Sequence, residues 1–143
     1  MNPRHQVSVA SYAILLQEDK VLLMKRANTG YFDGYYSLPS GHIEVNEFPD
    51  QAVIRETKEE IGVDIIDPRF VMVMYTDDNY ACFFFEVAKW DGEITNCEAD
   101  KCDDLAWFAM DQLPENLTPE VKSALDSYKK RIRYTNLKIL KSA

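Results

Sequence analysis

Residues 41–63 read GHIEVNEFPDQAVIRETKEEIGV, and the rest of the chain is best interpreted from this stretch outward. It predicts a helix over 49–61. Pro49 suits the first helical position, where the missing N–H costs nothing, and Gly62 suits the position just past the end. The preceding residues, 37–46, include a proline and a glycine, so we expect an irregular segment leading into the helix.

Three glutamates crowd together on this predicted helix. At about 100° per residue, Glu56, Glu59 and Glu60 fall within an arc of about 100°, one turn apart. Carboxylates at such spacings repel one another by roughly 0.2–0.5 kcal/mol per pair. The neighbouring arc is expected to face the core, and it carries Val53, Ile54, Thr57 and Ile61.

Crowded carboxylates beside a core face indicate a group that neutralises them. Mg²⁺ is the natural candidate because it binds carboxylate and carbonyl oxygens and keeps water and phosphate ligands. The helix alone leaves a second interpretation open, an acidic face in solvent. The segment before the helix favours the cation, since Ser40 and Gly41 follow a proline in a turn where backbone can approach a metal. Glu47 can brace Arg55 through a bidentate contact.

These residues resemble the Nudix box. The glycine and charged positions of its pattern are filled at their usual spacing by Gly41, Glu47, Arg55, Glu56, Glu59, Glu60 and Gly62. So many specified positions in one short stretch rarely coincide by chance. A further block, 98–114, resembles MutT-like nucleotide pyrophosphatases. The resemblance implies an α+β chain with the Nudix fold, an α/β/α sandwich with a mixed β-sheet, in a single domain over 1–143.

The resemblance also implies a role for each polar position. The implied metal ligands are the backbone carbonyl of Ser40 and the carboxylates of Glu56, Glu59 and Glu60. The cation would be Mg²⁺, with Mn²⁺ able to substitute. Arg55, paired with Glu47, would orient the catalytic carboxylates, and Glu56 is favoured as the group that acts as or positions the general base. Glu98 matches more loosely and would add a ligand or base.

Three positions depart from the family's pattern. Thr57 stands where an aliphatic residue is usual, so its buried hydroxyl needs a partner, such as the carbonyl one turn back. Ser40 replaces a glycine, but a carbonyl ligand does not depend on the side chain. Asn46 replaces another glycine, and asparagine tolerates positive φ. None of these changes removes a catalytic group.

The predicted reaction is attack of water on phosphorus in a nucleotide diphosphate bond. Arg26, His42 and Tyr80 are predicted substrate contacts, and aromatic residues near the loops could stack on a base. The leading hypothesis is hydrolysis of a nucleoside triphosphate, oxidised ones included, to a monophosphate and diphosphate. Alternatives are a sugar-nucleotide or dinucleotide (NADH-like) pyrophosphatase and a non-catalytic Nudix-fold nucleotide-binding module. Because no arginine or glutamate of the box is missing, the sequence favours an enzyme.

Apolar runs predict the other elements. Strands are expected over 7–16 and 21–24, joined by a polar turn, and over 70–75, 81–90 and 105–110. A second helix is expected from Thr118, as its cap, to about Arg133.

The composition disfavours several classes of binding partner and of protein. With 16 basic and 24 acidic residues the net charge is −8, which disfavours duplex nucleic acid. Three cysteines without a CxxC pair disfavour a disulfide framework, and no apolar run approaches the length of a membrane span. We therefore expect a cytoplasmic protein with a small nucleotide substrate and no membrane partner. A homodimer stays open, since dimers are frequent among similar proteins.

Overall fold

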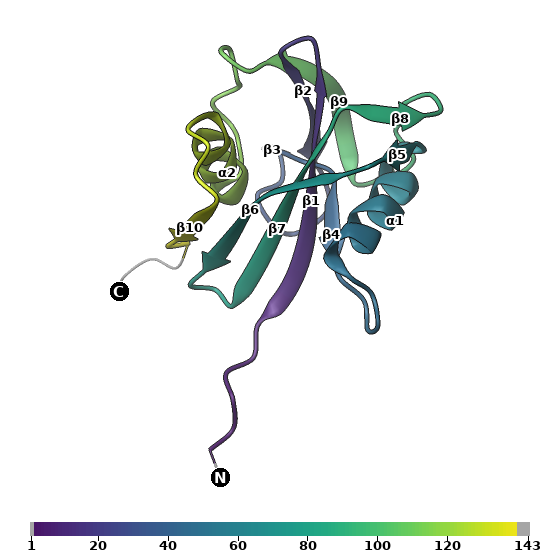
Figure 1. Cartoon of the computed structure of the whole chain (residues 1–143). Coiled ribbons are helices and arrows are strands. Elements are labelled where there is room, and N and C mark those ends of the chain that lie inside the picture. Colours follow the sequence, from purple (N-terminus) through teal and green to yellow (C-terminus); the bar gives the residue numbers. More distant parts are fainter. Residues whose placement is uncertain (1, 140–143) are drawn as a thin grey trace.

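The computed structural model describes residues 2–139 and has two helices and ten strands over that range (Figure 1). The helices are α1 (Pro49–Ile61) and α2 (Pro119–Lys129). The strands are β1 (Ser8–Gln17), β2 (Lys20–Arg26), β3 (Tyr36–Ser37), β4 (Ser40–His42), β5 (Asp64–Ile66), β6 (Arg69–Thr76), β7 (Tyr80–Val87), β8 (Lys89–Asp91), β9 (Cys102–Ala109) and β10 (Tyr134–Leu137). Neither helix of this range is long and apolar enough to cross a membrane.

The strands form a mixed sheet, as the sequence predicted. Its order is β10-β6-β7-β1-β2-β3, and in addition β4 pairs with β1 and β9 with β2. β1 runs parallel to β7 and β10 parallel to β6, whereas the other pairs of this sheet are antiparallel. Strands β5 and β8 pair separately.

The central strand β1 lies between two apolar clusters, because successive side chains of a strand point to opposite faces. Ile14 packs in one cluster with Leu125 of α2. Leu15, the next residue, packs in the other with Val53 and Ile61 of α1. Figure 1 shows the two helices on either side of the sheet. The predicted α/β/α sandwich is therefore confirmed.

Helix α1 begins and ends where its sequence predicts. Pro49 occupies the first turn, and Gly62 closes the helix with φ 77°, a left-handed conformation that glycine adopts without strain. The Gly62 N–H donates to the Lys58 carbonyl at 3.0 Å. Asn46, which replaces the usual glycine, has φ 65°, as expected for a residue that tolerates this region.

The core face of α1 differs from the prediction at one position. Thr57 is fully buried, and its hydroxyl donates to the Val53 carbonyl one turn back at 2.6 Å, as expected. Ile54 is 38% exposed, so the prediction that it faces the core is wrong, and Ala52 is buried instead. Ala52 and Ile54 flank Val53 on opposite sides around the helix, so the buried face is rotated toward Ala52 and Ile54 lies at its edge.

Several element boundaries also differ from the prediction. The expected strand 81–90 is two strands, since β7 ends at Val87 and β8 pairs with β5 instead. Helix α2 ends at Lys129 rather than Arg133, because Arg131 turns the chain at φ 59°. Thr118 is the N-cap residue of α2, as predicted, and its carbonyl accepts the Lys122 N–H at 2.9 Å, but its side chain forms no capping hydrogen bond. The strands β3, β4, β5 and β10 were not expected.

Candidate active site

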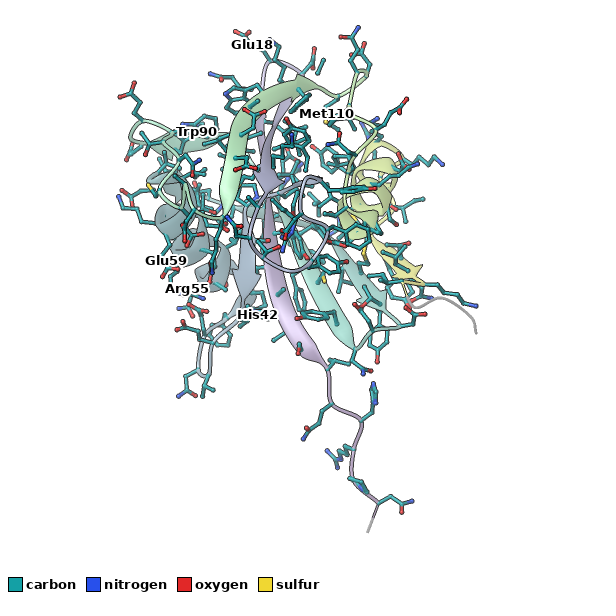
Figure 2. The ribbon with its side chains drawn as sticks, turned by 180° about the vertical axis from the view of Figure 1, so that it is seen from behind. Glu18, His42, Arg55, Glu59, Trp90 and Met110 are labelled. Atoms are coloured by element: carbon teal, nitrogen blue, oxygen red, sulfur yellow. The ribbon has the colours of Figure 1, made fainter. Side chains whose placement is uncertain are left out.

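The carboxylates of α1 face strand β4. The Glu60 Oε1 accepts the Ser40 N–H at 2.7 Å, and a Cβ at Gly41 would overlap the carboxyl group of Glu56. The Glu56 side chain is 17% exposed, whereas that of Glu59 is 51% exposed. Two of the three glutamates therefore lie against the backbone of β4 and the third lies at the outer rim, where Figure 2 shows it.

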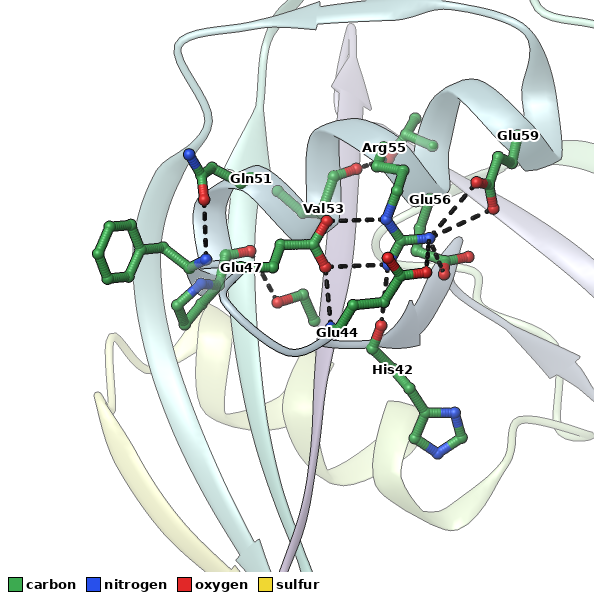
Figure 3. A network of polar contacts seen from close by, with 12 residues as sticks. His42, Glu44, Glu47, Gln51, Val53, Arg55, Glu56 and Glu59 are labelled. Atoms are coloured by element: carbon green, nitrogen blue, oxygen red, sulfur yellow. Dashed lines mark hydrogen bonds and ion pairs between the residues drawn. The ribbon is translucent and has the colours of Figure 1, made fainter.

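Arg55 holds this cluster from its outer side (Figure 3). Its Nε and Nη2 donate to the two carboxylate oxygens of Glu47 at 2.8 and 3.0 Å, which is the predicted bidentate brace. Its Nη2 also donates to the His42 carbonyl at 3.0 Å, and its Nη1 donates to Glu56 Oε1 at 2.6 Å. Glu59 is more distant, with both oxygens 3.4 Å from Nη1. One guanidinium thus ties the loop, β4 and α1 together.

The pKa values within the cluster move in opposite directions. The hydrogen bond from Arg55 lowers the pKa of Glu47 to about 2. Burial raises the pKa of Glu56 even though Arg55 acts against it, with smaller contributions from Glu59 and Glu98. Burial also holds the pKa of Glu60 well above its usual range. The structure therefore favours the ionised form of Glu47, whereas burial penalises ionisation of the two inner carboxylates, Glu56 and Glu60.

The carbonyl of Ser40 points to the same side as the glutamates. In an antiparallel pair, hydrogen-bonded and non-bonded positions alternate along the strand. The Ala13 N–H donates to the Pro39 carbonyl at 2.9 Å, so Ser40 occupies a non-bonded position. Both its N–H and its carbonyl are directed away from β1, and the N–H reaches Glu60.

These residues suit a divalent cation by chemistry. The ligand set around Glu60 consists of carboxylate and carbonyl oxygens, which hard cations prefer, and burial, the largest cause of the raised pKa of Glu60, makes its ionised form costly unless positive charge is brought beside it. Within residues 2–139, however, no three acidic, histidine or cysteine side chains already converge as a metal site. Glu56 is engaged by Arg55 and Glu60 by Ser40. Each of these contacts uses one oxygen, Oε1, and a carboxylate has about four acceptor sites, so both side chains can bind a cation while keeping these partners.

A pocket of about 630 Å³ opens beside this cluster. The predicted residues along its wall are Arg26, Ser40, Gly41, His42, Glu60, Tyr80 and Glu98. His42 and Tyr80 contact each other, with His42 Nε2 and the Tyr80 hydroxyl 2.8 Å apart. The other predicted side chains, Glu47, Arg55, Glu56 and Glu59, do not line the pocket. The predicted site residues therefore fall into two groups, those that line the pocket and those of the ion-pair network around Arg55.

Arg26 also has a structural role that the sequence did not predict. Its Nε donates to the Tyr31 carbonyl at 2.7 Å, and its guanidinium lies 5.4 Å from the centre of the Tyr31 ring. Arg26 therefore holds the loop between β2 and β3 in place, and it also lines the pocket.

Comparison with known proteins identifies the family. A model of the NUDIX domain matches residues 4–129. The chain belongs to the NUDIX domain family. A Nudix enzyme of Proteus vulgaris, named 8-oxo-dGTP diphosphatase, is 29% identical over 98 residues, which cover 66% of this chain and 88% of that protein. The predicted family and the predicted class, a Nudix hydrolase, are confirmed.

Two further Nudix proteins are similar over most of the chain. The NAD-capped RNA hydrolase NudC of Pseudomonas aeruginosa is 28% identical over 110 residues, or 76% of this chain, but the match spans only 38% of that enzyme. The crystal structure of a MutT NUDIX hydrolase from Burkholderia pseudomallei superposes with a TM-score of 0.80 at 28% identity. The superposition covers 85% of this chain and 98% of the Burkholderia pseudomallei chain.

The sequence missed two acidic residues on the wall of the Nudix pocket. Glu120 and Asp78 both line it, and Glu120 accepts a hydrogen bond from the Tyr31 hydroxyl at 2.9 Å. Glu120 lies in the first turn of α2, where an acidic residue is common for helical reasons alone. No local pattern distinguishes a pocket-facing glutamate from such a residue, so only the fold could reveal it.

Replacing Arg55 by lysine is expected to lower kcat/KM and cation affinity by about 10–100-fold. Lysine keeps the charge, but a single ammonium cannot bridge Glu47, the His42 carbonyl and Glu56 as the guanidinium does. Steady-state kinetics and a cation titration measure the two effects. Arg69→Lys is the matched control, because Arg69 is 72% exposed and pairs with Glu86 outside the pocket. Equal activity of both variants would show that the brace is dispensable.

Proposed function

We propose that this Nudix hydrolase cleaves a diphosphate bond in a nucleoside triphosphate, oxidised nucleotides included, and releases a nucleoside monophosphate and diphosphate. The observation that carries the proposal is the position of Glu60, whose carboxylate accepts the Ser40 N–H at the wall of a pocket that is large enough for a nucleotide. The similarity to the 8-oxo-dGTP diphosphatase of Proteus vulgaris over 88% of its length supports the same substrate class.

The proposed cation is Mg²⁺, with Mn²⁺ as a substitute, and Glu56, Glu59, Glu60 and the Ser40 carbonyl would hold it. Glu98, also on the pocket wall, is a further candidate ligand or base. When bound, such a cation offsets charge on phosphoryl oxygens and makes a bound water more acidic.

Side chains of the protein would position the catalytic carboxylate, accept the proton of water and contact the substrate. Arg55 and Glu47 keep Glu56 in one position, because three of their contacts are 3.0 Å or shorter. A carboxylate of the cluster, Glu56 in our assignment, accepts or directs the proton of the attacking water. Arg26 and His42 are placed on the wall to contact the phosphates or the nucleoside. Water is thus activated on the α1 side while the substrate occupies the pocket.

A second substrate class rests on one observation. The match to NAD-capped RNA hydrolase NudC covers 76% of this chain, so a dinucleotide or another nucleoside-diphosphate compound is the alternative to a triphosphate. A sugar nucleotide belongs to the same alternative. A non-catalytic binding module is disfavoured because Arg55 and the three glutamates are all present.

The test of the proposal is a substrate panel. Phosphate and diphosphate release is measured with nucleoside triphosphates, oxidised nucleotides, sugar nucleotides and dinucleotides, with Mg²⁺ and with EDTA. We expect Mg²⁺-dependent release of diphosphate from a triphosphate. Turnover of only a dinucleotide would move the assignment to the alternative, and tight binding without turnover would establish the binding module.

Cation affinity is expected to rise with pH. Burial raises the pKa of Glu60, so a larger fraction of the molecules has this carboxyl group protonated as the pH falls. The proton must leave before the carboxylate can bind a metal. Calorimetric titration with Mg²⁺ in buffers of different ionisation enthalpy counts the released protons. Glu60→Gln is the control and should release fewer. Affinity that does not change from weakly acidic to neutral pH would contradict the role of this carboxylate.

Three further properties complete the proposal. We propose that the chain acts as one domain over 1–143, in the cytoplasm, on small nucleotides rather than on duplex nucleic acid or membranes. The net charge of −8 supports the exclusion of duplex nucleic acid. A homodimer is compatible with the family resemblance, and light scattering of the purified chain tests it.

A further inference from the structure

The end of helix α2 and strand β10 concentrate basic residues in an acidic chain. Residues 129–138 contain five of the 16 basic residues and none of the 24 acidic ones, whereas the whole chain has a net charge of −8. The five, all exposed, are Lys129, Lys130, Arg131, Arg133 and Lys138. Among residues 2–139, none of them forms an ion pair with an acidic group. Ion pairs within the described residues therefore leave this positive charge unneutralised.

One face of the sheet carries exposed aromatic side chains beside these cations. The register of β10 and β6 sets Tyr134 beside Val73 and Asn136 beside Tyr75, so all four side chains point to this face. Val73 also pairs with Phe83, which packs against the apolar cluster under α1. It is therefore the face on which α1 lies, but α1 does not cover β6 and β10, because Tyr75 is 40% and Tyr134 61% exposed. Figure 1 shows β10 at the edge of the sheet, away from α1.

Arg133 connects the positive charge with the aromatic face. Its guanidinium lies 5.7 Å from the centre of the Phe70 ring, and Phe70 is itself 38% exposed. Phe70 packs edge-on against Phe85 of the α1 cluster, with ring centres 6.0 Å apart, which places it on the same face as Tyr134. We call the region the β10 surface, and it consists of Phe70, Tyr75, Ile132, Tyr134, Asn136 and the five cations.

Structural roles explain only part of the β10 surface. Cations at the end of a helix offset its dipole, which accounts for Lys129 and Lys130 but not for Arg133, which lies beyond the helix. Charged side chains on an edge strand prevent pairing with another chain, but exposed aromatic residues on the same strands favour association. Of the ten large apolar side chains exposed in residues 2–139, the β10 surface holds four. Cations and aromatic rings together therefore indicate a ligand.

The chemistry of the β10 surface selects a flexible polyanion with aromatic groups. Proteins that bind single-stranded nucleic acid hold its phosphates with cations and stack its unpaired bases on aromatic rings. A duplex offers no unpaired base for stacking, and a second copy of this chain would bring two sets of unneutralised cations together. The Tyr134 hydroxyl donates to Asn136 Oδ1 at 2.6 Å, and the amide N–H groups of Asn136 donate to no other described residue. They are available for the 2′-hydroxyl that distinguishes RNA from DNA.

We propose that the β10 surface binds single-stranded RNA. Bases stack on Tyr134 and Tyr75, and phosphates lie along the edge of the sheet against Arg133 and the neighbouring cations. The two tyrosines occupy diagonal positions on adjacent strands, about 7–8 Å apart, so one strand of RNA can contact both. The inference goes beyond the proposed function and does not rest on it, because no residue of the β10 surface lines the pocket.

Fluorescence anisotropy measures the binding directly. The full chain is titrated into a labelled single-stranded RNA of about 12 nucleotides, within the length that such sites cover. The RNA has a 5′-hydroxyl end and the buffer contains EDTA, so neither hydrolysis nor the proposed cation contributes. We expect a Kd of about 10⁻⁶–10⁻⁴ M at physiological salt, and a plot of log association constant against log salt concentration with a slope of about −2 to −3.5. DNA of the same sequence should bind more weakly.

The cations of the surface are tested as a group. Lys130→Gln, Arg133→Gln and Lys138→Gln together should raise the Kd at least about 10-fold and make the salt slope less steep by about 2. The matched control replaces three exposed lysines of other elements and has the same net charge, so it should keep the slope of the unaltered chain. It combines Lys20→Gln, Lys58→Gln and Lys89→Gln.

The aromatic face is tested at its most exposed ring. Tyr134→Ala removes a stacking surface and should raise the Kd about 5-fold or more, whereas Tyr134→Phe keeps the ring and should retain most of the affinity. Circular dichroism checks that each variant folds. If the basic triple variant does not fold, the comparison of Tyr134→Ala with Tyr134→Phe decides alone.

Several outcomes would overturn the inference. These are no RNA binding by the unaltered chain, or equal RNA affinity in the basic triple variant and its control. Vesicles of phosphatidylserine and phosphatidylcholine are the second probe, and binding to them without RNA binding would reassign the β10 surface to a membrane. A dimer that Tyr134→Ala dissociates, again without RNA binding, would reassign it to a second copy of the chain.

The test also separates this inference from the proposed function. A chain that binds RNA through the β10 surface but hydrolyses no nucleotide would keep the inference and refute the hydrolase. A chain that hydrolyses a nucleoside triphosphate but does not bind RNA would do the reverse.

Discussion

Glu60→Gln is expected to lower the cation-dependent kcat by about 10²–10⁴-fold and to leave the fold intact. Glutamine has the shape of glutamate, and its carbonyl oxygen can still accept the Ser40 N–H. What it removes is the negative charge at the pocket wall. Kinetics with Mg²⁺ measure the loss, and circular dichroism checks the fold. Glu115→Gln, on the surface, is the matched control and should have full activity.

The same variant is expected to be more stable than the unaltered chain in EDTA at neutral pH. Burial raises the pKa of Glu60 above the value it has in the unfolded chain, so the ionised form destabilises the fold. The loss of folding free energy is complete at a pH above the pKa of Glu60 in the folded chain. It disappears at a pH below the pKa of Glu60 in the unfolded chain, because Glu60 is then protonated in both states. Urea denaturation should therefore give Glu60→Gln a larger free energy of unfolding than the unaltered chain at neutral pH and an equal one at acidic pH. Full activity, or a loss of stability at neutral pH, would contradict the assignment.

Gly41→Ala is expected to reduce kcat/KM by about 10²-fold or more while the protein remains folded. The added Cβ would overlap the Glu56 carboxyl group, which lies directly over the backbone of β4. This carboxyl group is the end of a flexible side chain, so it can move aside at small cost to stability. Moving it breaks its 2.6 Å contact with Arg55 and displaces a proposed metal ligand.

Gly34→Ala is the matched control for this variant. Gly34 has φ 88°, so alanine is strained there, yet within the described residues no atom lies within 4 Å of the added Cβ. It should lose about 1 kcal/mol of stability and keep its activity. Thermal denaturation and steady-state kinetics compare the two. An active Gly41→Ala variant would show that Glu56 does not need its present position.

The local features of α1 could be predicted from the sequence. Proline at the start, glycine at the end and three glutamates on one arc depend only on helical geometry and backbone conformation. The brace between Glu47 and Arg55 was predictable for a related reason, since both lie in the same short segment. The four unexpected strands were not, because two to four residues carry too little periodicity, and their pairing partners lie elsewhere in the chain.

By itself the sequence determined helix α1, its charged residues and the family, because these depend on neighbours within about two dozen positions. Only the tertiary structure decided which carboxylates lie against β4, and that Glu120 reaches the pocket. The contact between Tyr31 and Glu120 joins residues 89 positions apart. Such contacts arise when a mixed sheet brings distant segments together, and no periodicity along the chain encodes which side chains then meet.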